Sequence, residues 1–511
     1  TIDISDNTIN AEVVNFSPVV NLDTIYGANT WPFGYGVYEP KITAAPTKVN
    51  MSPATITGNC DAEYVAYVNV TAAPDTTGYR MVVKFNPAMV EVTKVENGTF
   101  LTGEVVAGQS DTIDNVTGRL VFERTKYATG GTNYPDHGGG SLIKITFTPK
   151  AAGDSSFTID GADSYLMDWP DAFDIPYEIT GGASVDLDGV VKNLGTGAEY
   201  CDLASAVEGA SSTTNQTLQL LADIIIPETV TVDKELTLDL NGKTATAGNI
   251  NALHVTTSAG DLTITDSGTT GKITGGTRAV MVNGGGSLTL TNGWLDGTGF
   301  DGVFVYGEGS SVTVNGGKIT GLYYGISGNG SAAPSEYYGS TNILITGGTV
   351  QGGETAIFHP ELGLLKITGG TITGGSYNGI EMKAGDLEIT GGTITTSAAF
   401  VATPAQTGNG NTQSGDAILI YNRAGYLGTM TVNITGGTIT SANGYALREY
   451  TYGSEPSRTT LIEITGGDFS GGTGTDEANE AVTFMTVAPD ILKVTDGRYN
   501  YDPDEFVYAP Y

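Results

Sequence analysis

The sequence predicts an all-β protein in which a β-sandwich is followed by a long stack of short parallel strands. Between residues 236 and 500 one phrase keeps returning: two alternating apolar residues, then Thr or Asn, a Gly and another apolar residue. The segment 51–188 instead carries longer runs of β-branched and aromatic residues, separated by turn residues. Both patterns indicate strands, but only the first is an internal repeat, so two architectures are expected in one chain.

Length and charge limit what the protein can be. A chain of 511 residues is too long for one ordinary core, so two or three domains are expected. The net charge of -33 argues against nucleic acid or an anionic lipid surface as partner, because both would repel the chain. No run of 18 apolar residues occurs, so no membrane span is predicted. Few cysteines in a large Thr-, Gly- and Asn-rich β protein are typical of an exported bacterial protein, secreted, extracellular or on the cell surface.

Residues 1–50 form an irregular leader with short alternating pieces. The apolar residues that alternate are Ile2, Ile4, Ile9 and Val13. One interpretation is that the leader packs along its own domain. The other is that it adds a strand to a sheet of the next molecule, where main-chain hydrogen bonds would supply affinity.

Residues 51–188 are predicted to form the β-sandwich, with turn residues every eight to twelve positions. Strands are expected at 64–70, at 78–98 as two strands around an Asn-Pro turn, at 118–123 and at 140–148. These phrases, in this order, resemble a cohesin-type module, the sandwich that binds dockerins in extracellular cellulose-degrading assemblies. The resemblance implies the fold more than the function, because similar modules occur in surface proteins that have no dockerin partner.

Four acidic residues crowd one loop of this module: Asp163, Asp168, Asp171 and Asp174. Oxygen ligands at such spacing suit Ca²⁺, although the regular spacing of an EF-hand loop is absent. The alternative is a solvated acidic loop. No cofactor is required, and Ca²⁺ is the candidate ion.

Residues 189–235 are expected to cap the stack of strands. Apolar residues recur at helical spacing in 200–210, followed by a strand at 218–226. A stack of coils must close its open end, so we expect Leu203, Ala206 and Val207 to plug the first coil.

The repeats of 236–500 define coils of three short strands. The Gly that precedes the last two residues of each phrase stands at 293, 317, 348, 370, 392, 437, 467 and 497, which gives a base period of about 22 residues with inserted loops. Each coil has a first strand after the Gly pair, a second strand, and a third strand that leads into the next pair. Period two turns alternate side chains inward, and the inward residues are expected to be Ile372, Ile394 and Ile439 on the first strand, Ile357, Ile380, Ile418 and Leu447 on the second, and Leu387, Ile389, Ile462 and Ile464 on the third.

This pattern resembles the right-handed parallel β-helix of pectate-lyase-like proteins, as found in repeat regions of bacterial surface proteins. The resemblance covers roughly half of the chain and is the only source of the handedness. It implies about ten coils and, at one strand spacing per coil, a length of roughly 45 to 50 Å. The tail 501–511 resembles the segment that closes such repeat regions.

Enzymes of that fold carry acidic Ca²⁺ ligands with a basic residue, or paired carboxylates. Neither set is visible in this sequence. Glu381 and Arg448 are interpreted as isolated, and His359 as a packed or exposed corner residue. The chain is therefore expected not to be an enzyme, with a polysaccharide lyase or hydrolase as the alternative.

A binding wall is the better candidate, because outward positions of the second strand are large. The candidates are Phe304, Tyr306, Phe358, Leu419 and Tyr421 on the strands, with Tyr337, Tyr338, Tyr450 and Tyr452 on inserted loops. If exposed, they would bind a protein or stack on sugar rings. The other interpretation is that the loops bury them.

The sequence thus favours a non-catalytic bacterial surface protein, either a scaffold or a self-assembling filament or appendage subunit with adhesive potential. Its expected partners are other copies of itself, head to tail, or another surface protein, with a polysaccharide as the other candidate. Ice binding is a minor alternative, suggested by the outward Thr pairs of 371–373, 393–395 and 438–440.

Overall fold

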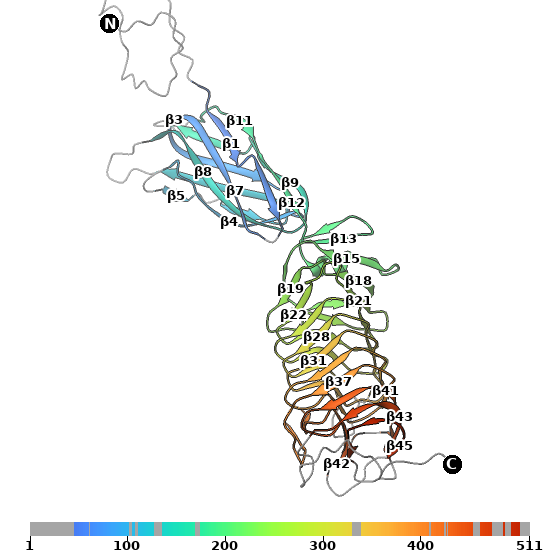
Figure 1. Cartoon of the computed structure of the whole chain (residues 1–511). Helices are drawn as coiled ribbons and strands as arrows, with labels where there is room; N and C mark the ends of the chain where they lie inside the picture. The colour runs from blue at the N-terminus through green and yellow to red at the C-terminus, as the bar shows by residue number, and fades with distance from the viewer. Residues whose placement is uncertain are drawn as a thin grey trace, which may run out of the picture. The chain divides into compact units, whose positions relative to one another are not determined.

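The chain forms two compact units, Thr1–Asp188 and Gly189–Tyr511, in the computed structural model (Figure 1). The division falls where the expected sandwich gives way to the expected cap. Residues described by the structure are 45–60, 62–101, 105–107, 111–126, 135–168, 174–329, 339–407, 410–423, 426, 428–452, 460–472, 484–485 and 492–500. Within these ranges, no helix has both the length and the apolar character needed to cross a membrane.

The N-terminal unit is built around one long strand, β3 (Tyr64–Lys84), which pairs with five others in antiparallel fashion. Its described strands are β1 (Lys48–Ser52), β2 (Thr55–Asn59), β3, β4 (Val90–Asn97), β5 (Val105–Ala107), β6 (Thr112–Asp114), β7 (Arg119–Lys126), β8 (Asp136–Pro149), β9 (Gly153–Ile159), β10 (Tyr165–Asp168), β11 (Glu178–Gly181) and β12 (Ala183–Asp188). Buried Phe147 packs on Phe157, with ring centroids 4.8 Å apart. The unit is therefore a β-rich domain with an apolar interior.

Two boundaries differ from the sequence-based expectation. The strands predicted at 64–70 and from 78 are a single strand, because β3 continues through the polar stretch between them. Its pairing with β8 shifts register after Val68, Val70 and Ala73, so bulges bend the strand instead of ending it. The sandwich also begins earlier than residue 51, since β1 includes Lys48. The predicted leader strand, with Ile2, Ile4, Ile9 and Val13, lies outside the described residues.

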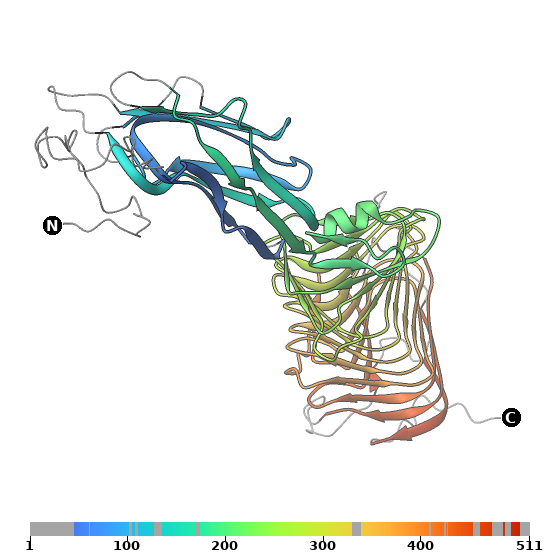
Figure 2. The same ribbon diagram turned by 90° about the horizontal axis from the view of Figure 1, so that it is seen from above.

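The C-terminal unit begins with the predicted cap. Helix α2 (Leu203–Gly209, Figure 2) is N-capped by Asp202, whose carboxylate accepts a hydrogen bond from the Ser205 backbone N–H at 2.7 Å. Leu203, Ala206 and Val207 are buried in the same apolar cluster as the strands that follow, as expected. The strand predicted at 218–226 is two strands, because a corner separates β15 (Gln216–Leu220) from β16 (Ile224–Ile226).

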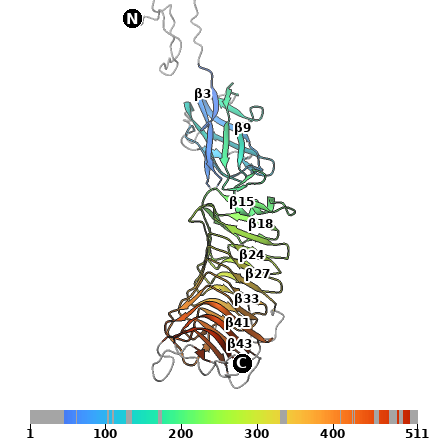
Figure 3. The same ribbon diagram turned by 45° about the vertical axis from the view of Figure 1, so that its right-hand side comes forward.

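After the cap, the strands form three parallel ladders (Figures 1 and 3). The first ladder contains β16, β19 (Thr244–Ala247), β22 (Lys272–Gly275), β25 (Trp294–Gly297), β28 (Lys318–Gly321), β31 (Thr349–Gly352), β34 (Thr371–Gly374) and β37 (Thr393–Thr396). The second contains β17 (Val230–Val232), β20 (Leu253–Val255), β23 (Arg278–Val282), β26 (Asp301–Val305), β29 (Tyr324–Ser327), β32 (Thr355–His359), β35 (Ile380–Met382), β40 (Ile418–Asn422), β42 (Leu447–Thr451) and β44 (Phe484–Met485). The third contains β15, β18 (Glu235–Asp239), β21 (Asp261–Thr265), β24 (Ser287–Leu290), β27 (Ser311–Val314), β30 (Asn342–Ile345), β33 (Leu364–Ile367) and β36 (Asp386–Ile389).

Three longer strands, β41 (Met430–Ser441), β43 (Thr460–Ser470) and β45 (Leu492–Tyr499), join the third ladder to the first in the last coils. Each strand therefore pairs with its equivalent in the next coil, which is consistent with the predicted β-helix. All eleven residues expected to point inward are at most 1% exposed and belong to one continuous cluster.

The Gly pairs serve the two purposes expected of them. The second Gly of a pair takes a positive φ, such as 83° at Gly370 and 88° at Gly392. The first leaves no room for a side chain, since a Cβ on Gly391 would lie 2.5 Å from the Thr368 carbonyl oxygen of the preceding coil. The corner thus lets neighbouring coils approach closely.

Candidate functional site

The outward face of the second ladder carries the residues singled out from the sequence. Parallel register places them in columns. One column reads His254, Met281, Phe304, Ser327, Phe358, Glu381, Leu419 and Arg448. We call the stretch over β20, β23 and β26 the open part, and the stretch over β32, β35, β40 and β42 the covered part.

In the covered part the predicted wall is buried. Phe358, Leu419 and Tyr421 are at most 4% exposed, so they do not form an exposed binding surface. The insert 398–415, with its small hairpin of β38 (Ala405–Gln406) and β39 (Thr412–Gln413), supplies part of this cover. We call it the covering insert. This outcome is the second of the two interpretations that the sequence left open.

Charged side chains hold the covering insert. Lys383 Nζ donates to the Gly410 carbonyl and lies 3.3 Å from Glu381 Oε1, and Glu381 Oε2 accepts from the Thr412 backbone N–H at 2.9 Å. Both side chains are fully buried. Burial raises the pKa of the Glu381 carboxyl and lowers that of the Lys383 ammonium, and the attraction between the two opposes both shifts.

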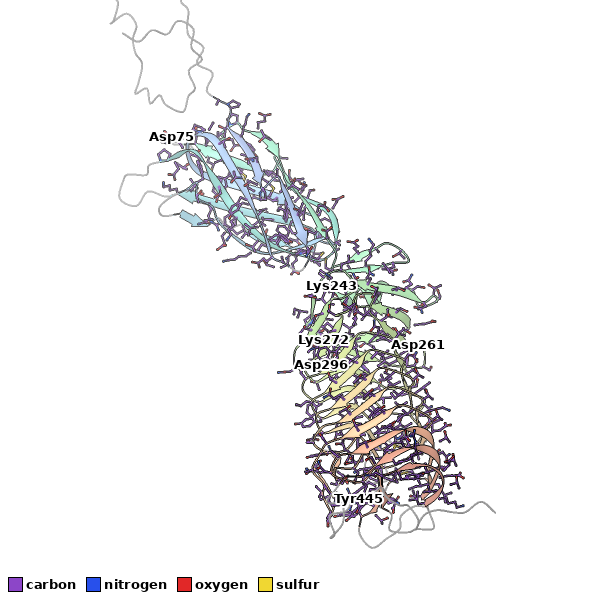
Figure 4. All side chains as sticks on the ribbon, in the orientation of Figure 1. Asp75, Lys243, Asp261, Lys272, Asp296 and Tyr445 are labelled. Atoms are coloured by element: carbon purple, nitrogen blue, oxygen red, sulfur yellow. The ribbon has the colours of Figure 1, made fainter. Side chains whose placement is uncertain are left out.

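Arg448 makes the second attachment. Its guanidinium donates to the Val401 and Ala402 carbonyls of the insert, and Nη1 lies 3.7 Å from Asp416 Oδ2. The rings of Tyr445, near the C-terminal end of the stack (Figure 4), and Phe400 each lie 5.5 Å from the guanidinium carbon. Burial raises the pKa of Asp416 to about 6, against the lowering effect of Arg448.

These contacts correct the interpretation of Glu381 and Arg448 as isolated. Each has a charged neighbour and backbone partners on the covering insert. Sequence reasoning missed the partners because any residue type can supply a backbone carbonyl or N–H. Glu361 was missed for the same reason: its buried carboxylate accepts from the backbone N–H groups of Asn329 at 2.6 Å and Gly307 at 3.1 Å. Burial raises the pKa of Glu361 to about 8.

His359 is packed inside the coil. In the stack of coils, Val255, Val282 and Val305 align in one inward column. His359 also points inward, further along the stack, and pairs in register with Met382 of the next coil. Its Nδ1 lies 3.2 Å from the Ala384 carbonyl oxygen, and burial lowers its pKa to about 4. Of the two expectations for this residue, the packed one is confirmed.

The open part carries a continuous chain of side-chain contacts that no insert residue described by the structure interrupts. It joins Tyr323, Phe300, Arg278, Phe304, Tyr306, Asn283 and His254, which we call the aromatic band. Phe300 is 45% exposed, and the others are half-buried. Phe304 and Tyr306 are therefore partly accessible, in contrast to Phe358, Leu419 and Tyr421 of the covered part.

Distances along the aromatic band are short. The Phe300 ring centroid lies 5.6 Å from that of Tyr323, and the Phe304 centroid 5.1 Å from that of Tyr306. The Arg278 guanidinium carbon lies between the two ring pairs, 4.2 Å from the Phe304 centroid and 5.8 Å from that of Phe300. Arg278 Nε donates to Asp301 Oδ2 at 2.8 Å, while burial raises the pKa of that carboxyl.

The remaining sequence candidates are scattered. Tyr450 is partly buried and stacks on Tyr421 at 5.9 Å, and Tyr452 is 51% exposed. Tyr337 and Tyr338 lie outside the described residues. On the first ladder, Thr371, Thr393 and Thr438 do align in one column, but it continues into Asp468. In earlier coils of the same ladder, Lys272 and Asp296 replace the Thr pairs and form an ion pair at 2.7 Å (Figure 4).

The acidic loop of the N-terminal unit shows no metal cage in its described part. Asp163 forms an ion pair with Arg119 at 3.1 Å, and Asp168 lies on β10. Among the described residues, no group of three or more His, Cys, Asp or Glu side chains is placed to hold a metal ion. Asp174 is exposed, and Asp171 lies outside the described ranges, so the Ca²⁺ hypothesis stays a prediction.

Comparison with known proteins gives matches to solved structures alone. No protein-family model matches the chain, and no curated protein matches it. The solution structure of CaCohA2 from Clostridium acetobutylicum is 19% identical, with 29% of this chain and 93% of that chain covered and a TM-score of 0.23. A type II cohesin domain from the cellulosome of Acetivibrio cellulolyticus is 17% identical, with 28% and 96% covered and a TM-score of 0.24.

A non-cellulosomal cohesin from Archaeoglobus fulgidus is 12% identical, with 28% of this chain and 91% of that chain covered and a TM-score of 0.22. These three structures are cohesins, the kind of module that the sequence of 51–188 resembles. At these identities and TM-scores they assign neither a family nor a partner to this chain.

Proposed function

We propose that the protein is a non-catalytic scaffold of the bacterial cell surface, a rigid stack of coils that presents a binding face and assembles with other copies. The observation that carries the proposal is that the ionisable groups on the second ladder are already bonded within the protein. In the covered part they hold an insert in place, and in the open part the charge of Arg278 is paired with Asp301.

A catalytic acid or base must come within hydrogen-bond reach of its substrate. Glu381, Lys383, Asp416 and Arg448 are at most 1% exposed, and each bonds to backbone groups or to another of the four. The shifted pKa values of Glu381, Lys383 and Asp416 follow from burial. A polysaccharide lyase or hydrolase is the alternative function, and for these four groups to act in it the insert would have to leave this face.

Edge strands support assembly into larger structures. In the described part of the N-terminal unit, β2 pairs only with β12, and β11 only with β1. Unpaired N–H and C=O groups of an edge strand accept a strand from another molecule. A leader strand from the next copy would make a head-to-tail contact, which forms filaments when it does not close into a ring.

Electron microscopy of the purified full-length protein tests the proposal. Filaments or regular multimers that disappear when residues 1–20 are deleted would support it. Monodisperse particles that depolymerise a glycan would overturn it in favour of the enzyme. The deletion variant should keep the melting temperature of the parent, so that loss of assembly is not confused with unfolding.

A further inference from the structure

We propose that the aromatic band binds a linear, neutral polysaccharide laid along strand β26. This inference rests on the proposed non-catalytic function and names the ligand class of its binding face. Among the residues that the structure describes, the band is the part of the second-ladder face where rings and amide groups stay at the surface instead of lying beneath an insert.

The aromatic band is a row of rings and polar groups in contact with one another. From Phe300 through the Arg278 guanidinium carbon and Phe304 to Tyr306, successive distances between ring centroids and that carbon are 5.8, 4.2 and 5.1 Å. Tyr323 lies beside Phe300 on the next coil, with the two ring centroids 5.6 Å apart. Sugar rings have apolar C–H faces that pack on aromatic rings, and hydroxyl edges that need polar partners.

Polar partners are fixed in place beside the rings. Tyr306 OH accepts a hydrogen bond from Asn283 Nδ2 at 2.6 Å, and Asn283 Oδ1 lies 2.9 Å from His254 Nε2. Tyr306 OH keeps its proton to donate, and Asn283 keeps its second N–H. Because these groups, on β20 and directly after β23 and β26, already hold one another in position, little conformational entropy is lost when a ligand binds.

The charges of the protein favour an uncharged polysaccharide as the ligand. Arg278 is bound to Asp301 at 2.8 Å, so the pair presents no net positive charge to a ligand. The whole protein carries a net charge of -33, which would repel a uronic acid polymer. Phe, Tyr and Arg are also enriched at protein interfaces, but the centre of such an interface is a compact, fully desolvated patch. The band is a narrow strip in which rings alternate with charged and amide groups.

Affinity electrophoresis of the full-length protein tests the inference. The probes are hydroxyethyl cellulose, xylan and mannan as neutral chains and polygalacturonate as the acidic chain. We expect retardation by at least one neutral chain and none by polygalacturonate. Removing one stacking ring, Phe304→Ala or Phe300→Ala, should weaken the retention about tenfold. Tyr452→Ala, which removes an exposed ring outside the band, should leave it unchanged.

The outcomes separate this inference from the proposed function. Filaments without retention by any neutral chain would overturn the ligand assignment and leave the scaffold intact. Retention by polygalacturonate alone would also overturn it. So would a protein partner that binds the unmodified protein but not the Phe304→Ala variant. Depolymerisation of a probe would instead overturn the non-catalytic function. Unchanged circular dichroism and melting temperature of each variant show that the loss is local.

Discussion

The open and covered parts of the second ladder share one backbone register but differ in chemistry. In the open part, rings and amides lie at the surface, and the paired arginine, Arg278, keeps 23% of its side chain exposed. In the covered part, Arg448 has a carboxylate neighbour of the same kind but only 1% exposure. Burial of an ion pair is unfavourable unless further hydrogen bonds compensate the lost hydration. The covering insert supplies those bonds, so it and the charges depend on each other.

The largest effect is expected from removing the charge of Arg448. Arg448→Met leaves the Asp416 carboxylate buried without its cation and the Val401 and Ala402 carbonyls without their donor. We expect a loss of roughly 3 to 5 kcal/mol in the free energy of opening of the covering insert. Native-state hydrogen exchange of the insert amides measures this free energy.

Arg278→Met is the matched control in the open part. Its partner, Asp301, is also buried and loses the same kind of contact, but water reaches the arginine and no insert residue described by the structure bonds to it. We expect a loss of about 2 to 3 kcal/mol, smaller than for Arg448→Met because no insert carbonyl loses its donor, measured in the same way at β23 and β26. Equal losses for the two variants would contradict the comparison between the two parts.

The pair of Glu381 and Lys383 should show strong coupling. Glu381→Gln or Lys383→Met alone leaves one buried charge unpaired, and we expect about 3 kcal/mol of destabilisation for each. The double variant has no such charge, so its loss should fall short of the sum by about 1 to 3 kcal/mol. A double-mutant cycle on urea unfolding measures the difference. Additivity within about 0.5 kcal/mol would mean that the two side chains act independently.

The pH dependence should also distinguish the two parts. The inward column holds Val282 and Val305 in the open part and His359 where the covered part begins. The pKa of His359 falls from 6.5 to about 4 on folding, so only the unfolded chain takes up a proton between these values. Stability from this residue is therefore complete above pH 6.5 and lost as the pH falls toward 4, by about 3 kcal/mol.

His359→Met removes the titrating group and keeps an apolar side chain of similar size. Urea unfolding of both proteins is measured between pH 7 and pH 4. The free energy of unfolding of the unmodified protein minus that of the variant should fall by about 3 kcal/mol over this range. A constant difference across this range would show that the histidine does not govern acid stability.

The ladders could be predicted from the sequence, but the position of the covering insert could not. Ile372, Ile394 and Ile439 recur with the coil period, so stacking and inward direction follow from the repeat itself. The burial of Phe358, Leu419 and Tyr421 depends on where an irregular insert lies, and no periodicity encodes that. The partners of Lys383 and Arg448 are backbone carbonyls, which carry no residue signature. The continuity of β3 was missed because bulges let a strand pass through residues that usually mark a turn.

The smallest effect on stability is expected at the surface of the open part, where binding should respond most. Phe300 is 45% exposed and contributes its ring to the aromatic band without closing any core. Phe300→Ala should change the free energy of unfolding by less than about 1 kcal/mol, because little buried area is lost. Its retention by a neutral glycan should nevertheless fall about tenfold.

Leu419→Ala should have the opposite effects in the covered part. It should destabilise the protein by roughly 2 to 5 kcal/mol, because Leu419 is fully buried. It should leave glycan retention of the folded fraction unchanged. A loss of both properties in either variant would mean that the two parts are one cooperative surface, with the covering insert stabilising the band as well.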